Sequence, residues 1–216
     1  MLKKIKLGLS LVKYGFRPGT NLTMCILFII IGLVVEVASK GTNIIGGFYV
    51  LLTGMFVYQM IISMDLSCFV QTTKMKKALQ TTVPVVTGTL LYLVIYTLLV
   101  IEKAILIKAY PENVNNLLGS SVLLIVLLFG AMVYTGFCYK YFVGGTIFYA
   151  IYVMVSMPTV EVLVGRNIIT PTFLGIVIFG YAAILLGGVV EYLLSCALYK
   201  KDISKFAFRG IFGKIQ

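Results

Sequence analysis

Four acidic side chains lie inside or beside long apolar stretches, where a carboxylate is unusual enough to suggest chemistry. They are Glu36, Asp65, Glu102 and Glu191. A charge at the centre of a membrane helix costs about 2.5–3.5 kcal/mol, so such a residue needs water, a partner or a function. Glu36 and Glu102 lie about one turn from the expected outer ends of their spans, where water should reach them. Glu191 lies deeper, about 13 Å along a helix from Lys200.

Asp65 and Glu191 each allow two interpretations. Either carboxylate could be hydrated or hydrogen-bonded between helices, or it could line a polar pathway. Tyrosines such as Tyr92 and Tyr181 could line a cavity for an amphipathic substrate, or they could anchor helices at the membrane interface. We therefore take Asp65, Glu191, Tyr92 and Tyr181 as the candidate translocation pathway.

The residues that most enzymes use are missing. The chain has no histidine, so the usual general base and metal ligand are absent. Its four cysteines form no C-x-x-C motif, and we expect no disulfide framework. The stretch Gly210–Lys214 has the wrong spacing for a nucleotide-binding P-loop. We expect a protein that is not an enzyme and has no catalytic, cofactor-binding or metal-binding residue of its own.

The composition places most of the chain in lipid. Hydrophobic residues make up 60% of the 216 residues, and the mean hydropathy is +1.05. A soluble protein cannot cover that much apolar surface. The net charge of +11 does not indicate nucleic-acid binding, because the basic residues lie at the ends of apolar segments rather than along a continuous patch.

Six apolar runs are long enough to predict membrane helices, which need about 20 residues each. The sequence therefore predicts an all-α polytopic membrane protein that forms one domain over residues 1–216. The fifth run is short, and the stretch MPTVEVLVGRNIITPT follows it. This stretch is too apolar for a solvated loop, so we expect residues 158–171 to form an extracellular re-entrant segment. The expected spans are 21–39, 44–70, 84–107, 117–138, 142–157 and 172–198.

The basic residues predict the orientation of these spans. With the N-terminus inside, the cytoplasmic segments hold fourteen of the eighteen lysines and arginines, which places both termini in the cytoplasm. The expected outer segments hold Lys40, Lys103, Lys108 and Arg166. Residues 1–18 have apolar side chains at spacings of three and four, so they predict an interfacial amphipathic helix ended by Pro18 and Gly19.

The stretch QTTKMKKALQTTVP interrupts two apolar runs and raises the question of its purpose. Met75, Ala78 and Leu79 fall on one face of a helix, and Lys74 and Lys77 fall on another. One interpretation is a basic loop that rests on anionic lipid. The other is a cytoplasmic helix over residues 71–82 that docks onto a partner protein.

The arrangement resembles the ABC-2 type permeases, the membrane subunits of bacterial ATP-binding-cassette exporters. The resemblance lies in the basic N-terminal helix, the six spans with both ends inside, the polar segment after span two and the expected re-entrant segment. The local match is LSCFVQTTKMKKALQTTVPVV, a polar and basic run followed by a proline that opens span three. The acidic residues usual in that family segment are missing here.

The resemblance implies a multi-pass protein of the plasma membrane that exports an amphipathic substrate, such as a peptide or drug. It implies a separate ATPase subunit that holds ATP and Mg, and a second permease subunit in a homodimer or heterodimer. It also implies that residues 71–82 form a coupling helix, whose ATPase-contacting residues would be Lys74, Met75, Lys77, Ala78 and Leu79. The lipid bilayer is the remaining partner, and no nucleic acid is expected.

Two other classes of protein fit parts of the same pattern. One is the substrate-binding membrane subunit of a vitamin uptake transporter, which also has six spans and a similar length. That class uses an Ala-x-x-x-Ala motif in its first span, which CILFIIIGLVVEVAS lacks. The other is a non-transporting membrane scaffold or immunity protein. An ATPase that co-purifies with the chain would separate the exporter from the scaffold.

Overall fold

The computed structural model describes residues 2–15, 17–41, 43–63, 74, 76–202, 204 and 206. Within these residues the chain is helical and has no strand. Six helical segments are long and apolar enough to cross a membrane, so the predicted all-α, six-span class is confirmed. The elements are α1 (Leu2–Tyr14), α2 (Pro18–Ala38), α3 (Ile45–Ser63), α5 (Lys76–Gln80), α6 (Thr82–Ala109), the short 3₁₀ helix η2 (Pro111–Asn113), α7 (Val114–Phe137), α8 (Phe142–Gly165) and α9 (Phe173–Leu198).

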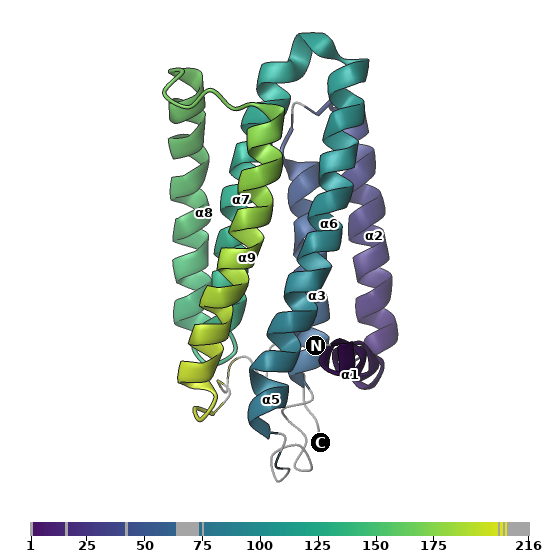
Figure 1. Ribbon diagram of the computed structural model, residues 1–216, viewed down its shortest axis with the longest axis vertical. Coiled ribbons are helices and arrows are strands. Elements are labelled where there is room, and N and C mark those ends of the chain that lie inside the picture. The colour runs from purple at the N-terminus through teal and green to yellow at the C-terminus, as the bar shows by residue number, and fades with distance from the viewer. Residues whose placement is uncertain are drawn as a thin grey trace.

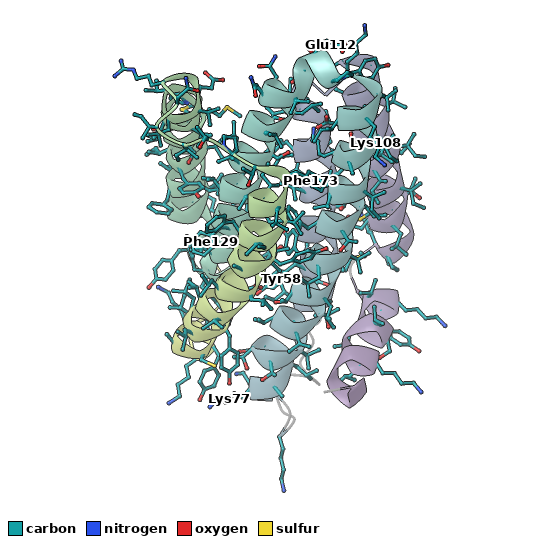
Figure 2. All side chains as sticks on the ribbon, turned by 45° about the horizontal axis from the view of Figure 1, so that its top comes forward. Tyr58, Lys77, Lys108, Glu112, Phe129 and Phe173 are labelled. Carbon is teal, nitrogen blue, oxygen red and sulfur yellow. The ribbon has the colours of Figure 1, made fainter. Side chains whose placement is uncertain are left out.

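The spans run side by side and define two ends of the bundle (Figure 1). We call the end that carries α1, α5 and the α7–α8 turn the α1 end. The opposite end, with the α2–α3, α6–α7 and α8–α9 connections, is the far end. Lys77 lies at the α1 end, and Lys108 and Glu112 lie at the far end (Figure 2).

The core lies where α3, α6, α7 and α9 meet. α7 packs between α8 and α9, α2 packs on α3, and α6 contacts both α3 and α9. The outward faces remain apolar, as Met154 on α8 (72% exposed) and Phe179 on α9 (70% exposed) illustrate. Such faces suit a lipid surround. The main buried cluster is Val50, Leu51, Tyr92, Ile95, Tyr96, Leu99, Leu124, Leu128, Met132 and Ile184.

Helix α1 lies across the base of the bundle and is seen end-on beside the upright spans in Figure 1. It contacts α6 and α3 through glycines. A methyl group added at Gly15 would lie 2.5 Å from the Met60 carbonyl oxygen, so only glycine allows this approach. The predicted N-terminal helix is therefore present. It ends at Tyr14, before the expected stop, and Pro18 opens α2 as its first residue.

The predicted re-entrant segment at 158–171 is wrong. Residues 158–165 continue α8, which is a full-length span of 24 residues with Pro158 inside it. α8 then ends in a Schellman motif, in which Asn167 has φ 56° and the Ile168 N–H donates to the Leu163 carbonyl oxygen at 3.0 Å. The connection to α9 is therefore a short turn.

The predicted helix at 71–82 is only partly described. Its described part is α5, a single five-residue turn. The helix is interrupted at Thr81, whose backbone has φ −122° and ψ −75°. α6 then begins at Thr82, with Pro84 in its first turn. α5 thus lies directly beneath α6 (Figure 1). α6 thus begins two residues before residue 84, the expected start of span three.

Candidate functional site

Glu191 faces the interior of the bundle. It is 1% exposed, and α7 approaches its backbone at Gly136, where an added Cβ would lie 3.2 Å from the Glu191 Cα. Neither carboxylate oxygen has a hydrogen-bond partner among the described residues. Thr135 lies beside the carboxylate. Its hydroxyl donates to the Met132 carbonyl oxygen at 2.8 Å, so its one proton is already in use.

Buried hydroxyl groups from three further positions surround this carboxylate. These residues are Tyr58 on α3, Tyr92 on α6 and Ser195 on α9, and each is at most 5% exposed. Both tyrosines lie close enough to Glu191 to interact with it electrostatically. The Tyr92 hydroxyl has no hydrogen-bond partner in the described part of the chain. We call Tyr58, Tyr92, Thr135, Glu191 and Ser195 the interior polar cluster.

A small cavity leads from this cluster toward the α1 end. Tyr58, Thr135 and Ser195 line it at the cluster, and Gln80 and Tyr199 line it at the base. Its volume of about 20 Å³ accommodates about one water molecule. The cluster can therefore receive a proton, a small cation or a hydrogen-bond donor in this conformation, but not an organic substrate.

The structure brings Glu191 and Tyr92 together but leaves Tyr181 elsewhere. The Tyr181 hydroxyl shares a hydrogen bond with the Thr97 hydroxyl at 2.8 Å, and its ring meets Tyr96 edge-on at 5.4 Å. Tyr181 lies about 15 Å from Glu191 along α9, because it is about ten residues away. It therefore helps to join α6 to α9 and is not part of the cluster. Asp65 lies outside the described residues.

The predicted coupling residues occupy the base of the α1 end. Lys74 and Lys77 are exposed, whereas Ala78 and Leu79 are half-buried. The Lys77 Nζ lies 5.5 Å from the centroid of the Tyr199 ring, which links α5 to the end of α9. Met75 lies outside the described residues.

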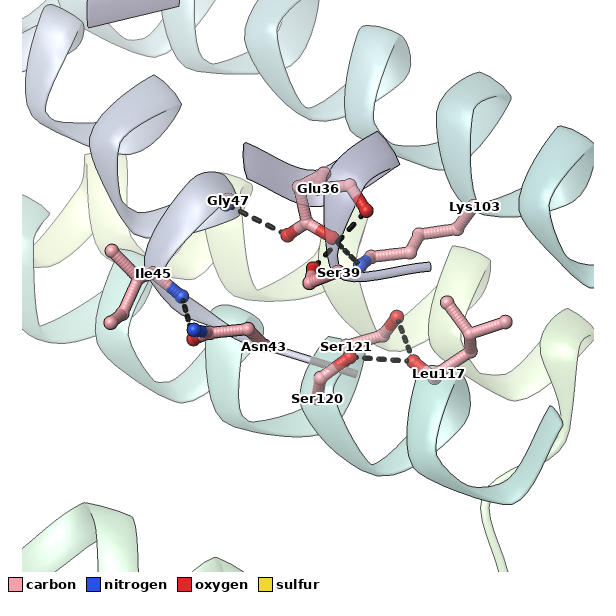
Figure 3. A network of polar contacts seen from close by, with 9 residues as sticks. All are labelled: Glu36, Ser39, Asn43, Ile45, Gly47, Lys103, Leu117, Ser120 and Ser121. Carbon is pink, nitrogen blue, oxygen red and sulfur yellow. Dashed lines mark hydrogen bonds and ion pairs between the residues drawn. The ribbon is translucent and has the colours of Figure 1, made fainter. Parts of the chain in front are cut away.

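Sequence analysis missed an ion pair near the far end. The Lys103 Nζ lies 2.7 Å from the Glu36 Oε2, and the Glu36 and Lys103 side chains are 0% and 5% exposed. The other carboxylate oxygen, Oε1, accepts the Gly47 N–H at 2.8 Å (Figure 3). Glu36 on α2 therefore caps the start of α3 and pairs with α6, which ties three helices together.

The expectation that water reaches Glu36 and Glu102 is wrong. Protein atoms cover both side chains, and the Glu102 carboxylate has no hydrogen-bond partner among the described residues. Lys103, expected in an outer segment, is likewise buried. The sequence contains one signal for this pair. Glu36 and Lys103 carry opposite charges, and each interrupts an apolar run near the same predicted membrane face.

A groove opens at the far end between α7, α8 and the α2–α3 connection. Its volume is about 600 Å³, within the range of small-molecule sites. This groove was not predictable from the sequence, because its walls come from three separated segments. Its lining residues are Asn43, Ile44, Asn115, Asn116, Gly119, Ser120, Leu123, Val160, Glu161, Val164 and Gly165.

The fold and the buried polar groups define the class of protein. Six long apolar helices indicate a multi-pass membrane protein. Comparison with known protein families, with curated proteins and with solved structures finds no match.

Proposed function

We propose that the chain is the permease subunit of an ABC exporter, which moves an amphipathic substrate outward with energy from a separate ATPase. The observation that carries this proposal is the interior polar cluster. An unpaired Glu191 carboxylate inside a six-span bundle is costly, and ionisable groups in such positions typically belong to a translocation path. In this proposal ATP and Mg belong to the partner, in keeping with a sequence that has no P-loop motif.

The distribution of charge supports a cytoplasmic α1 end in the plasma membrane. Basic residues gather at this end, and at the far end four basic residues are matched by Glu36, Glu102, Glu112 and Glu161. Cytoplasmic loops carry the excess of lysine and arginine. The basic side chains that the structure describes at the α1 end are Lys6, Lys13, Arg17, Lys74, Lys76, Lys77, Lys140, Lys200 and Lys201.

The position of α5 supports coupling between a bound ATPase and the cluster. α5 lies directly beneath α6, which carries Tyr92, and Gln80 of α5 lines the same small cavity as Tyr58, Thr135 and Ser195 of the cluster. A force applied to α5 would shift α6 relative to α9 and so change the surroundings of the Glu191 carboxylate. A second permease subunit, identical or not, would complete the path.

This proposal predicts that the apolar face of the coupling stretch matters more than its charges. The double substitution Met75→Asp and Leu79→Asp should detach the ATPase or abolish its stimulation, because buried anchors dominate interface energy. The matched pair Lys74→Gln and Lys77→Gln should have a mild effect, since exposed lysines contribute little. Co-purification of the ATPase with membrane-inserted variants measures both. If the lysine substitutions abolish ATPase binding and the apolar substitutions have no effect, the stretch is a lipid anchor and not a coupling helix.

The proposed orientation predicts the side from which Asn167 is reached. Asn167 is exposed in the α8–α9 connection at the far end. In a background without the native cysteines, Asn167→Cys should react with a membrane-impermeant thiol reagent added outside intact cells. A cysteine at Lys200, at the α1 end, should react only after the cells are opened. The reverse pattern would invert the topology and remove the site of ATPase docking.

The far-end groove favours a second candidate, the substrate-binding membrane subunit of a vitamin uptake transporter. A cavity of about 600 Å³ that opens at the proposed outer side could capture a small ligand there. Such a subunit should co-purify with a second, different membrane protein besides its ATPases. An exporter should bring only an ATPase and a permease subunit.

A further inference from the structure

The far-end groove has an apolar floor and a polar rim. Leu123 on α7 and Val160 on α8 are buried at its base, 5% and 8% exposed. Asn115, Asn116 and Glu161 are exposed among the lining residues. The apolar floor favours contact with an apolar group, and the polar rim favours a group that stays hydrated or hydrogen-bonded. Together they suit a ligand with an apolar chain and a polar head.

The rim leaves a defined set of groups for the ligand. The Asn43 Oδ1 already accepts the Ile45 N–H at 2.9 Å, and the Ser120 hydroxyl donates to the Leu117 carbonyl oxygen at 3.0 Å (Figure 3). The amides of Asn115 and Asn116 and the Glu161 carboxylate remain. These groups offer a negative charge and hydrogen-bond acceptors together with amide donors.

The charge of the rim selects among amphipathic ligands. Glu161 is the one charged side chain among the described lining residues, so the groove carries a formal charge of −1. No cation is present among the described lining residues to pair with a phosphate, sulfate or carboxylate head. A head group that carries an amine, guanidinium or quaternary ammonium meets complementary charge, and an anionic head meets repulsion.

We propose that the far-end groove binds a cationic amphipath, with its apolar chain on Leu123 and Val160 and its cationic head beside Glu161. The inference rests on the proposed function, because it assigns the charge class of the exported molecule at the outer side of the permease. It names a binding site that is separate from the interior polar cluster, which lies near the other end of α7.

The test uses the full chain in phosphatidylcholine nanodiscs, without any ATPase. Dodecyltrimethylammonium is the probe, and empty nanodiscs give the background from partition into lipid. We expect saturable binding, which Glu161→Gln should weaken about fivefold, as expected for one partly exposed ion pair. Glu112→Gln is the matched control. Glu112 is an exposed carboxylate at the same end outside the groove, and its loss should leave binding unchanged.

Two further measurements separate this site from general detergent binding. Dodecyl sulfate should not displace the probe, and Gly119→Leu should abolish binding, because the new side chain would grow from a Cβ 3.3 Å from Val164 into the groove. The proposal is overturned if dodecyl sulfate or dodecyl maltoside binds as tightly, or if Glu161→Gln behaves as Glu112→Gln. Neither result bears on whether an ATPase co-purifies with the chain. The groove proposal and the permease proposal can therefore fail independently.

Discussion

Replacing Lys103 with methionine should lower the free energy of unfolding by about 3–5 kcal/mol, because the buried Glu36 carboxylate then has no cation beside it. The Glu36 carboxylate is fully covered, and among the described residues it would keep only the Gly47 N–H as a partner. The loss should appear as a lower thermal unfolding temperature in detergent and a reduced yield of inserted protein. Lys108→Met is the control, since Lys108 is an exposed lysine on the same helix and its loss should change little.

The double variant Glu36→Gln with Lys103→Met isolates the ion pair. It removes both charges, and a glutamine can still accept the Gly47 N–H through its carbonyl oxygen. We expect the double variant to recover at least half of the stability lost by Lys103→Met, because neither buried group is then charged. If Lys103→Met matches the wild type, or if the two losses simply add, the pair does not hold α2, α3 and α6 together.

If the chain is the permease subunit proposed above, replacing Glu191 with glutamine should impair transport while stability stays close to that of the wild type. Glutamine has nearly the same shape, and the carboxylate it replaces has no hydrogen-bond partner among the described residues. Packing of α7 on α9 at Gly136 is therefore retained. The ability of the interior polar cluster to receive a proton or a cation is lost, so substrate-stimulated ATP hydrolysis by the assembled transporter should fall at least tenfold.

Thermal unfolding measured beside ATP hydrolysis separates the two roles of Glu191. A loss of hydrolysis with an unchanged unfolding temperature supports a functional role. Tyr92→Phe, which removes the unpaired hydroxyl and keeps the ring against Gly54, should weaken hydrolysis less. Wild-type hydrolysis in Glu191→Gln would assign Glu191 to packing alone.

The sequence predicted the six spans because each one is encoded locally, by a run of apolar residues between polar ends. The prediction fails at Pro158, because the expected fifth span ends at residue 157 whereas α8 continues to Gly165. Within α8 the Thr159 hydroxyl donates to the Val155 carbonyl oxygen at 2.6 Å, and side-chain bonds of this kind help a membrane helix to continue past a proline. The true end is set by Asn167, whose tolerance of positive φ completes the Schellman motif.

The candidate site was harder to predict, because its parts meet only in three dimensions. The position of Glu191, far from the ends of its predicted helix, suggested an interior location. Tyr92 was included because tyrosines could line a cavity for the substrate. Nothing in the sequence separated Tyr92 from Tyr181, since the side of α6 and α9 that faces the cluster depends on packing. Glu36 and Lys103 are 67 residues apart in the chain, so their pairing required the fold.

The central claim is that this chain works as a permease subunit with a separate ATPase, and the composition of its native complex tests it most directly. The tagged full chain should be purified from native membranes in a mild detergent, and its partners identified and quantified by mass spectrometry. The account predicts an ABC-type ATPase in a fixed ratio to the chain, and no ATP hydrolysis by the chain purified alone. A native complex without any ATPase, or ATP hydrolysis by the isolated chain, would contradict it.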